Sequence, residues 1–290
     1  MTAQQRVVRV RRNYNLWVAN QTLEDYALRF TAKTARRWSS ARVANTAIGA
    51  VSFLALEAIG GSITVNFGFV NATSAILAVG AVILLTSLPI AYYAAKFGVD
   101  IDLLTRGAGF GYLGSTITSL IYASFTFLFF AIEATIMSLA FEMCFGIPLF
   151  AGYVLSSLIV IPLVTHGITF ISRFQLWTQP VWIALHLIPF IYIASADSAS
   201  FERWTNFSGL AGHNGRSFDI ALFGTASTVV FSLIAQIGEQ VDFLRFLPAE
   251  GDRRTPAWWL ACLAAGPGWI IPGALKLLAG SFLAFLAVEH

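Results

Sequence analysis

Residues 71–95 read NATSAILAVGAVILLTSLPIAYYAA and contain no Asp, Glu, Lys or Arg. An α-helix rises 1.5 Å per residue, so a run of this length crosses the ~30 Å hydrocarbon core of a bilayer. Four more runs without charged residues reach or approach the same length, at 107–132, 174–196, 220–237 and 257–275. The sequence therefore predicts an all-α polytopic membrane protein.

Composition supports this class. Hydrophobic residues make up 57% of the chain and charged residues only 11%, whereas about 25% of a soluble domain is charged. The net charge of +3 does not indicate a nucleic-acid partner, because nine of the 18 basic residues lie within residues 1–42, beside the first span. Such a cluster is typical of a topology signal or of contact with the headgroups of the lipid bilayer.

Turn and cap residues divide the chain into seven predicted spans: Val43–Phe67, Thr73–Lys96, Ser115–Phe141, Pro148–Ile168, Phe174–Ile193, Phe218–Gly238 and Pro256–Ala287. With a cytoplasmic N-terminus, the inside segments hold fifteen basic residues and the outside segments only Arg203 and Arg216. We expect a basic cytoplasmic tail at 1–42 and a transmembrane domain at 43–290 in the inner (plasma) membrane. The domain ends directly after a span, so more chain is expected to follow.

A carboxylate in the first span marks a candidate site. A charged side chain at mid-membrane is unfavourable by at least ~2.5 kcal/mol, so Glu57 is expected to face the interior of the bundle. Gly60 and Gly61 follow it, and this pair predicts a break whose free backbone groups line a solute or cation site. The alternative is a close helix crossing at the two glycines, with Glu57 bonded to a neighbouring helix.

The sixth predicted span ends in a similar group of residues. Gln236, Gly238 and Glu239 place an amide, a glycine and a carboxyl together after an apolar run, as expected for a second interrupted helix. The alternative is an ordinary helix end that enters the cytoplasm. Asp242 is better explained by pairing with Arg245, three residues further on.

Glu133 lies in the third span. Helical spacing places Phe129 or Phe130 on its face, so a carboxyl group beside an aromatic ring could bind a flat heterocycle with N–H donors. The alternative is a structural hydrogen bond between helices. His166 and His186 also lie in spans, and we expect structural roles for both. No residue combination indicates an enzyme, a metal site or a cofactor.

Two loop segments resemble a known family. The first carries Lys96, Gly98, Arg106, Gly111 and Gly114 after the second span; the second is Asp242-Phe-Leu-Arg245-Phe after the sixth. They resemble the inner loop and the D-[FY]-x-R-[FY] segment of the nucleobase:cation symporter-1 family, which includes purine–cytosine, hydantoin and allantoin permeases. The Gly60-Gly61 pair also fits.

The resemblance implies a leucine-transporter-type inverted-repeat fold, here truncated after about seven spans, with the solute between the broken first and sixth spans. It implies a symporter for a nucleobase-like or related nitrogenous solute, coupled to Na+ or H+. Glu133 and Glu239 stand where the family usually has amides, which favours a more basic solute or proton coupling. The sodium site would need an eighth span. The alternative is a transporter-like sensory input domain fused to, or partnered with, a histidine kinase.

Overall fold

The computed structural model describes residues 30–249 and 255–289, apart from the side chain of His213. The α-helices are α2 (Ser40–Gly49), α3 (Ala55–Phe97), α4 (Ile101–Thr105), α5 (Gly111–Phe145), α6 (Leu149–Thr165), α7 (Gly167–Ala196), α8 (Ala199–Thr205), α9 (Ile220–Phe231), α10 (Gln236–Leu244), α11 (Pro256–Ala265) and α12 (Ile270–Glu289). Tighter or wider helical turns are η1 (Lys33–Ala35), η2 (Arg106–Phe110), η3 (Gly209–Arg216), η4 (Ser232–Ala235) and η5 (Pro267–Trp269). The described part of the chain forms no β-strand.

Five helical segments are long and apolar enough to cross a membrane: Ala55–Phe97, Ile101–Phe145, Gly167–Ala196, Ile220–Leu244 and Pro267–Glu289. The apolar helices α6 and α11 are shorter. The prediction of a multi-pass, all-helical membrane protein is confirmed at this level. The first predicted span is divided at residues 50–54, and the seventh, Pro256–Ala287, is divided at Gly266 between α11 and α12.

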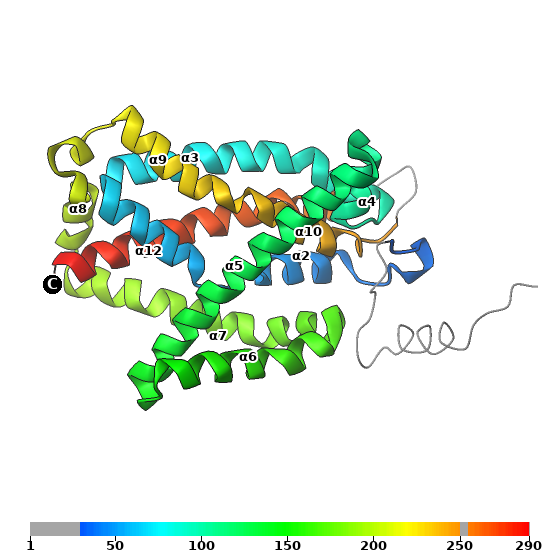
Figure 1. Ribbon diagram of the computed structural model, residues 1–290, viewed down its shortest axis with the longest axis horizontal. Helices are drawn as coiled ribbons and strands as arrows, with labels where there is room; N and C mark the ends of the chain where they lie inside the picture. The colour runs from blue at the N-terminus through cyan, green and yellow to red at the C-terminus, as the bar shows by residue number, and fades with distance from the viewer. Residues whose placement is uncertain (1–29, 250–254, 290) are drawn as a thin grey trace, which may run out of the picture.

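Helix α3 contains a reversal of chain direction. Its 43 residues would extend about 65 Å as one straight helix, roughly twice the hydrocarbon thickness. At Gly68 the backbone takes φ +80°, a conformation that favours glycine, and the chain turns back on itself (Figure 1). The buried Asn71 holds this turn, because its Nδ2 donates to Ser217 O and its Oδ1 accepts from Asp219 N.

The first predicted span is interrupted, but not at the expected position. Helix α2 ends at Gly49 and α3 begins at Ala55, so residues 50–54 form the break. The break predicted at Gly60-Gly61 is wrong, since α3 is helical through both residues. These glycines allow a close crossing with α12 instead: a Cβ at Gly60 would overlap the carbonyl oxygen of Leu277.

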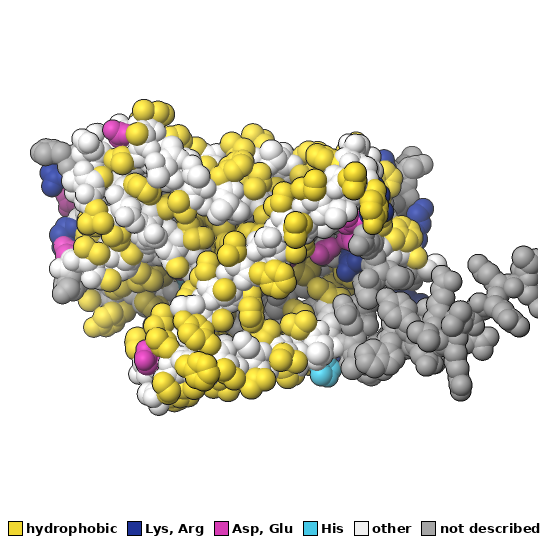
Figure 2. Space-filling model, in the orientation of Figure 1, with side chains coloured by type: hydrophobic (Ala, Val, Ile, Leu, Met, Phe, Trp, Pro, Cys, Tyr) yellow, Lys and Arg dark blue, Asp and Glu magenta, His cyan; other side chains and the backbone are white. Residues whose placement is uncertain are grey.

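The helices form two groups. Helices α3, α9 and α12 lie side by side in a packed group, while α5 crosses it obliquely and α6 and α7 lie along one side (Figure 1). Buried side chains such as Leu56, Ile76, Val230, Trp269 and Leu277 fill the core of the packed group. By contrast, the apolar side chains of α5, α6 and α7 are largely exposed, as expected of surfaces that face lipid or further helices (Figure 2).

Charged side chains gather towards the two ends of the molecule (Figure 2). We call the end with residues 30–42, 96–110 and 245–249 the basic end, and the end with residues 66–71, 145–149 and 196–220 the opposite end. Arg36 illustrates the packing at the basic end: it is buried and donates to Ala95 O at the C-terminus of α3. Residues 1–29 of the predicted tail, and Arg253 and Arg254, lie outside the described residues.

The loop at the opposite end contains the short helix α8. Trp204 of α8 packs on α12, because its Nε1 donates to Ser281 Oγ over 3.0 Å. Arg203 bonds to both Asp197 and Glu289 and thus joins α8 to the end of α12. The hydrogen bond from Arg203 lowers the pKa of the Asp197 carboxyl group.

Candidate functional site: a polar centre at two helix breaks

Two irregular helical passes meet near the centre of the described structure. The first is broken at residues 50–54, between α2 and α3. The second changes from α9 to the 3-10 turn η4 and then to α10, which starts at Gln236. Helix α10 contacts both α2 and α3. The sixth predicted span thus contains a tightened 3-10 turn but stays helical from Ile220 to Leu244, and the interruption predicted around Gly238 is wrong, since Gly238 lies inside α10.

A cavity of about 460 Å³, which we call the inner cavity, lies beside the 50–54 break and α10. Residues from α2, the 50–54 break, α5, α7 and α10 line it: Gly49, Ala50, Ser52, Phe53, Tyr122, Ile168, Ile171, Gln175, Glu239, Asp242 and Phe243. The cavity thus combines two carboxyl groups, one amide and three aromatic rings. This is the composition expected of a site that orients a small ligand.

Hydrogen-bond acceptors dominate the polar lining. Gln236 is fully buried beside the cavity, and its Nε2 donates to Glu239 Oε2 over 3.4 Å. The Oε1 atoms of Gln175 and Gln236 are both buried, with no hydrogen-bond partner among the described residues. Because a buried acceptor without a partner is unfavourable, these atoms are available to a ligand or to water.

The aromatic residues that line the inner cavity, which we call the aromatic wall, are Phe53, Tyr122 and Phe243. Close packing holds two of them in place. Tyr122 of α5 lies against Gly238, where a Cβ would come within 2.8 Å of the Tyr122 ring. Phe53, in the break, contacts Phe129 edge to face at a centroid distance of 5.6 Å, and Phe129 packs on Phe125. Of the two aromatic residues predicted beside Glu133, Phe129 therefore packs inside, whereas Phe130 is 44% exposed.

Glu133 caps the start of α3. Its Oε1 accepts a hydrogen bond of 2.6 Å from the backbone N–H of Ala55, the first residue of the helix. A carboxylate is favourable there, because the first N–H groups of a helix lack partners within the helix and carry partial positive charge. This arrangement matches the structural alternative for Glu133, a hydrogen bond between helices.

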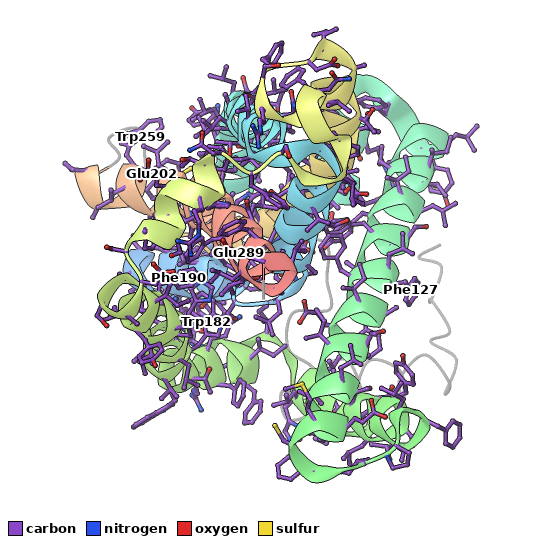
Figure 3. All side chains as sticks on the ribbon, turned by 90° about the vertical axis from the view of Figure 1, so that its left-hand side faces the viewer. Phe127, Trp182, Phe190, Glu202, Trp259 and Glu289 are labelled. Atoms are coloured by element: carbon purple, nitrogen blue, oxygen red, sulfur yellow. The ribbon has the colours of Figure 1, made fainter. Side chains whose placement is uncertain are left out.

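Glu57 bonds to a cation that we did not single out in the sequence. Lys276 of α12 is 3% exposed, and its Nζ lies 2.6 Å from Glu57 Oε1. His186 Nδ1 of α7 lies 3.4 Å from the same oxygen. Lys276 also lies over the Trp182 ring at 4.6 Å. We call Glu57, Lys276, His186 and Trp182 the ion-pair cluster; Figure 3 shows Trp182 on the side of α7 that faces the bundle.

The ion-pair cluster opens towards the opposite end. A groove of about 600 Å³ between α3 and α12 is lined by Glu57, Ala58, Gly61, Ser62, Val65, Asn66, Gly280, Leu283 and Ala284. Three sites therefore follow one another along α2 and α3. Residues 49–53 line the inner cavity, Glu57 forms the ion pair, and the groove extends from Glu57 to Asn66. On α7, Gln175, Trp182 and His186 share one face by helical spacing and follow the same line.

The eight predicted substrate-binding residues do not surround one cavity. Glu239 lines the inner cavity and Gln236 lies behind it, whereas Glu57 and Gly61 line the groove. Gly60 is buried at the crossing with α12, Glu133 caps α3, Phe129 backs Phe53, and Phe130 points outwards.

The family-like loop residues hold the basic end together. Gly98 ends α3 in the left-handed conformation, under the guanidinium group of Arg36. Arg106 pairs with the buried Asp102 and bonds to Ser115, while Lys96 lies over the Tyr92 ring. Gly111 takes φ +64°, and Gly114 packs against Phe110. Arg245 bonds to the backbone carbonyl of Asp242, not to the predicted carboxyl partner, and it also has further interactions.

A larger cavity of about 700 Å³ at the basic end is largely apolar. Its lining runs over Phe30, Pro89, Ile90, Tyr93, Phe97, Val99, Leu103, Leu104, Gly107 and Ala108. It offers a nitrogenous solute no charged partner, so the inner cavity is the better candidate. Within residues 30–249 and 255–289, no group of three or more His, Cys, Asp or Glu side chains could hold a metal ion.

No family model matches the sequence, and searches of curated proteins and of solved structures find no match either.

Proposed function

We propose that the protein is a secondary active transporter for a small nitrogenous solute. The observation that carries this proposal is the position of the inner cavity, with Glu239, Asp242 and three aromatic rings, beside the break at residues 50–54 in the first membrane pass. Irregular backbone at membrane depth is tolerated where it is buried or lines a cavity. Secondary transporters bind their solutes at such interruptions.

The geometry supports alternating access. The inner cavity lies towards the basic end and the groove lies towards the opposite end, with the ion-pair cluster between them along the first pass. In this proposal the two spaces open in turn, while the solute stays near residues 50–54. The coupling ion is Na+ or H+. By the resemblance, a sodium site would draw on backbone carbonyls at the break and on an eighth span.

The test is uptake by the full-length protein in proteoliposomes. Radiolabelled uracil, hydantoin, allantoin, putrescine and guanidinium would be supplied with an inward sodium gradient, an inward proton gradient or neither. We expect one of them to accumulate under one gradient, and Glu239→Gln to reduce that uptake at least about tenfold, since a lost charged hydrogen bond is worth ~1.5–3 kcal/mol. Glu142→Gln, an exposed carboxyl group at the end of α5, is the matched control.

Absence of gradient-driven uptake for the whole panel would contradict the transport proposal. If a solute binds but is not taken up, the sensory input domain of a histidine kinase becomes the better proposal, because sensing needs the cavity but not net transport.

A further inference from the structure

We propose that the inner cavity selects an organic cation whose positive charge is spread over several N–H donors on a flat group, such as an amidinium or guanidinium. The inference deepens the proposed function, and it rests on the cavity that the proposed function uses. It concerns the charge of the solute, which binding alone can test.

The charges around the cavity favour a cation. Its lining contains the carboxyl groups of Glu239 and Asp242, and no Lys, Arg or His side chain among the described residues. For Glu239 the hydrogen bond that the structure gives comes from the neutral amide of Gln236. An ionised carboxylate removed from water is stable when it is paired, so a cationic ligand supplies what the lining lacks.

Nearby cations are engaged elsewhere. Arg245 lies one turn beyond Asp242; its Nε donates to the Asp242 carbonyl and its guanidinium lies over the Phe246 ring at 5.0 Å. The positive charge of Arg245 and the negative charge of Asp100 both act on Asp242. Lys276 forms an ion pair with Glu57 in the ion-pair cluster. The charged neighbour given for Glu239 among the described residues is the like-charged Asp242, so Glu239 is the carboxyl group that lacks a cation.

Hydrogen-bond polarity gives an independent argument. Gln175 of α7 lines the cavity, and its Oε1 atom is buried beside Gly49 with no hydrogen-bond partner in the described part of the chain. Ionised carboxylates are acceptors only, so Glu239 and Asp242 offer acceptors, whereas the Ser52 and Tyr122 hydroxyl groups and the Gln175 amide can donate as well as accept. A neutral nucleobase would turn its own carbonyl groups towards some of these acceptors, whereas an amidinium presents only donors.

The aromatic wall suits the same ligand. Phe53, Tyr122 and Phe243 line the same cavity as the two carboxyl groups. The face of an aromatic ring attracts a cation electrostatically, and a flat guanidinium or amidinium can also stack on it. A cation with a planar charged group therefore meets both parts of the lining.

Three ligands of one shape test the charge directly: benzamidine (cationic), benzamide (neutral) and benzoate (anionic) at pH 7. Each would be titrated up to 20 mM into the full-length protein in detergent, and the apparent melting temperature recorded, since a ligand that binds the folded state raises it by mass action. We expect benzamidine to raise the melting temperature with an apparent Kd at least about tenfold below that of benzamide, and benzoate to have no effect.

Variants connect this selectivity to the cavity. Glu239→Gln is expected to remove the difference between benzamidine and benzamide, while Glu142→Gln keeps it. If Glu239→Gln does not fold, Asp242→Asn and Gln175→Leu provide the same comparison from two other helix positions. The selectivity for benzamidine over benzamide is itself measured on the unmodified protein, so that part of the test does not depend on any variant folding.

Benzamide binding as tightly as benzamidine, or no response to benzamidine, would overturn the inference. Charge selectivity that survives in all three cavity variants would also overturn it, because the cation would then bind elsewhere. The outcome is separable from transport: cation-selective binding without gradient-driven uptake would sustain this inference and remove the transport proposal.

Discussion

Glu57 and Lys276 stand on α3 and α12 and bury opposite charges 2.6 Å apart in the membrane part of the bundle. His186 and the Trp182 ring complete the surroundings of the pair, and Glu57 Oε2 has no hydrogen-bond partner among the described side chains. A buried ion pair adds little net stability, but loss of one partner leaves a lone charge in a medium that solvates it poorly. The effect of removing either side chain on the stability of the protein should therefore depend on whether the other side chain is present.

We expect Glu57→Gln and Lys276→Met each to lower the stability of the protein by about 3–5 kcal/mol, since each leaves one uncompensated buried charge. The double variant should recover most of the loss, because it removes both charges. The measurement is the apparent melting temperature in detergent for the four proteins of this double-mutant cycle. Lys96→Met, which removes an exposed lysine, is the control.

Additive losses in the double variant would show that the two side chains act independently, contrary to the structure. If the double variant regains stability, its uptake activity can be measured to show whether the ion pair also has a role in transport.

At the residue scale, the sequence identifies the acids but not their partners. Glu57, Glu133 and Glu239 are conspicuous because charge is rare inside apolar runs, and the structure places all three against other helices. Lys276 carries the same signal, a single lysine within the last apolar run, but its partner on α3 lies more than 200 positions away. Helical periodicity shows on which face of its own helix a residue lies, but it does not show which other helix packs against that face.

At the scale of elements, the crossing of α3 and α12 depends on glycines in both helices. A Cβ at Gly60 would overlap the Leu277 carbonyl oxygen, and a Cβ at Gly280 would overlap the backbone of Glu57. By contrast, a Cβ at Gly80, also in α3, would meet only Ile270 Cγ2 at an ordinary 3.6 Å. Close approach of the α3 and α12 backbones thus falls at the part of α3 that carries Glu57.

We expect Gly60→Ala to destabilise the protein by about 1–3 kcal/mol, because the helices must move apart to admit the methyl group. Gly80→Ala should be neutral or stabilising by up to about 1 kcal/mol through helix propensity. Both are measured as shifts in the apparent melting temperature in detergent. Equal shifts for the two variants would contradict the crossing geometry.

The extents of the helices were predictable, but the position of the first break was not. Runs without charged residues and turn residues such as Gly68 and Gly146 mark helix boundaries locally. The break at residues 50–54 depends on tertiary contacts, among them the cap that Glu133 provides to Ala55. The Gly60-Gly61 pair misled the prediction, because glycine serves equally for a break and for a close helix contact.

At the scale of the whole molecule, the basic residues are concentrated at one end. Arg36, Arg42, Lys96, Arg106 and Arg245 all lie at the basic end, as the seven predicted spans require. From the positive-inside rule we expect the basic end to lie in the cytoplasm and the groove on the outer side. This expected orientation would decide which cavity a solute outside the cell meets first.

The two cysteines allow this orientation to be tested without new residues. Cys144 is exposed in the last turn of α5 at the opposite end, whereas Cys262 is buried. We expect a membrane-impermeant maleimide to label Cys144 in cells whose inner membrane is intact and accessible, and Cys144→Ser to abolish the labelling. Cys262 should react only after denaturation, because reagents cannot reach a buried thiol. Labelling of Cys144 only after the membrane is permeabilised would reverse the orientation, and the inner cavity would then face outwards as the entry site for the solute.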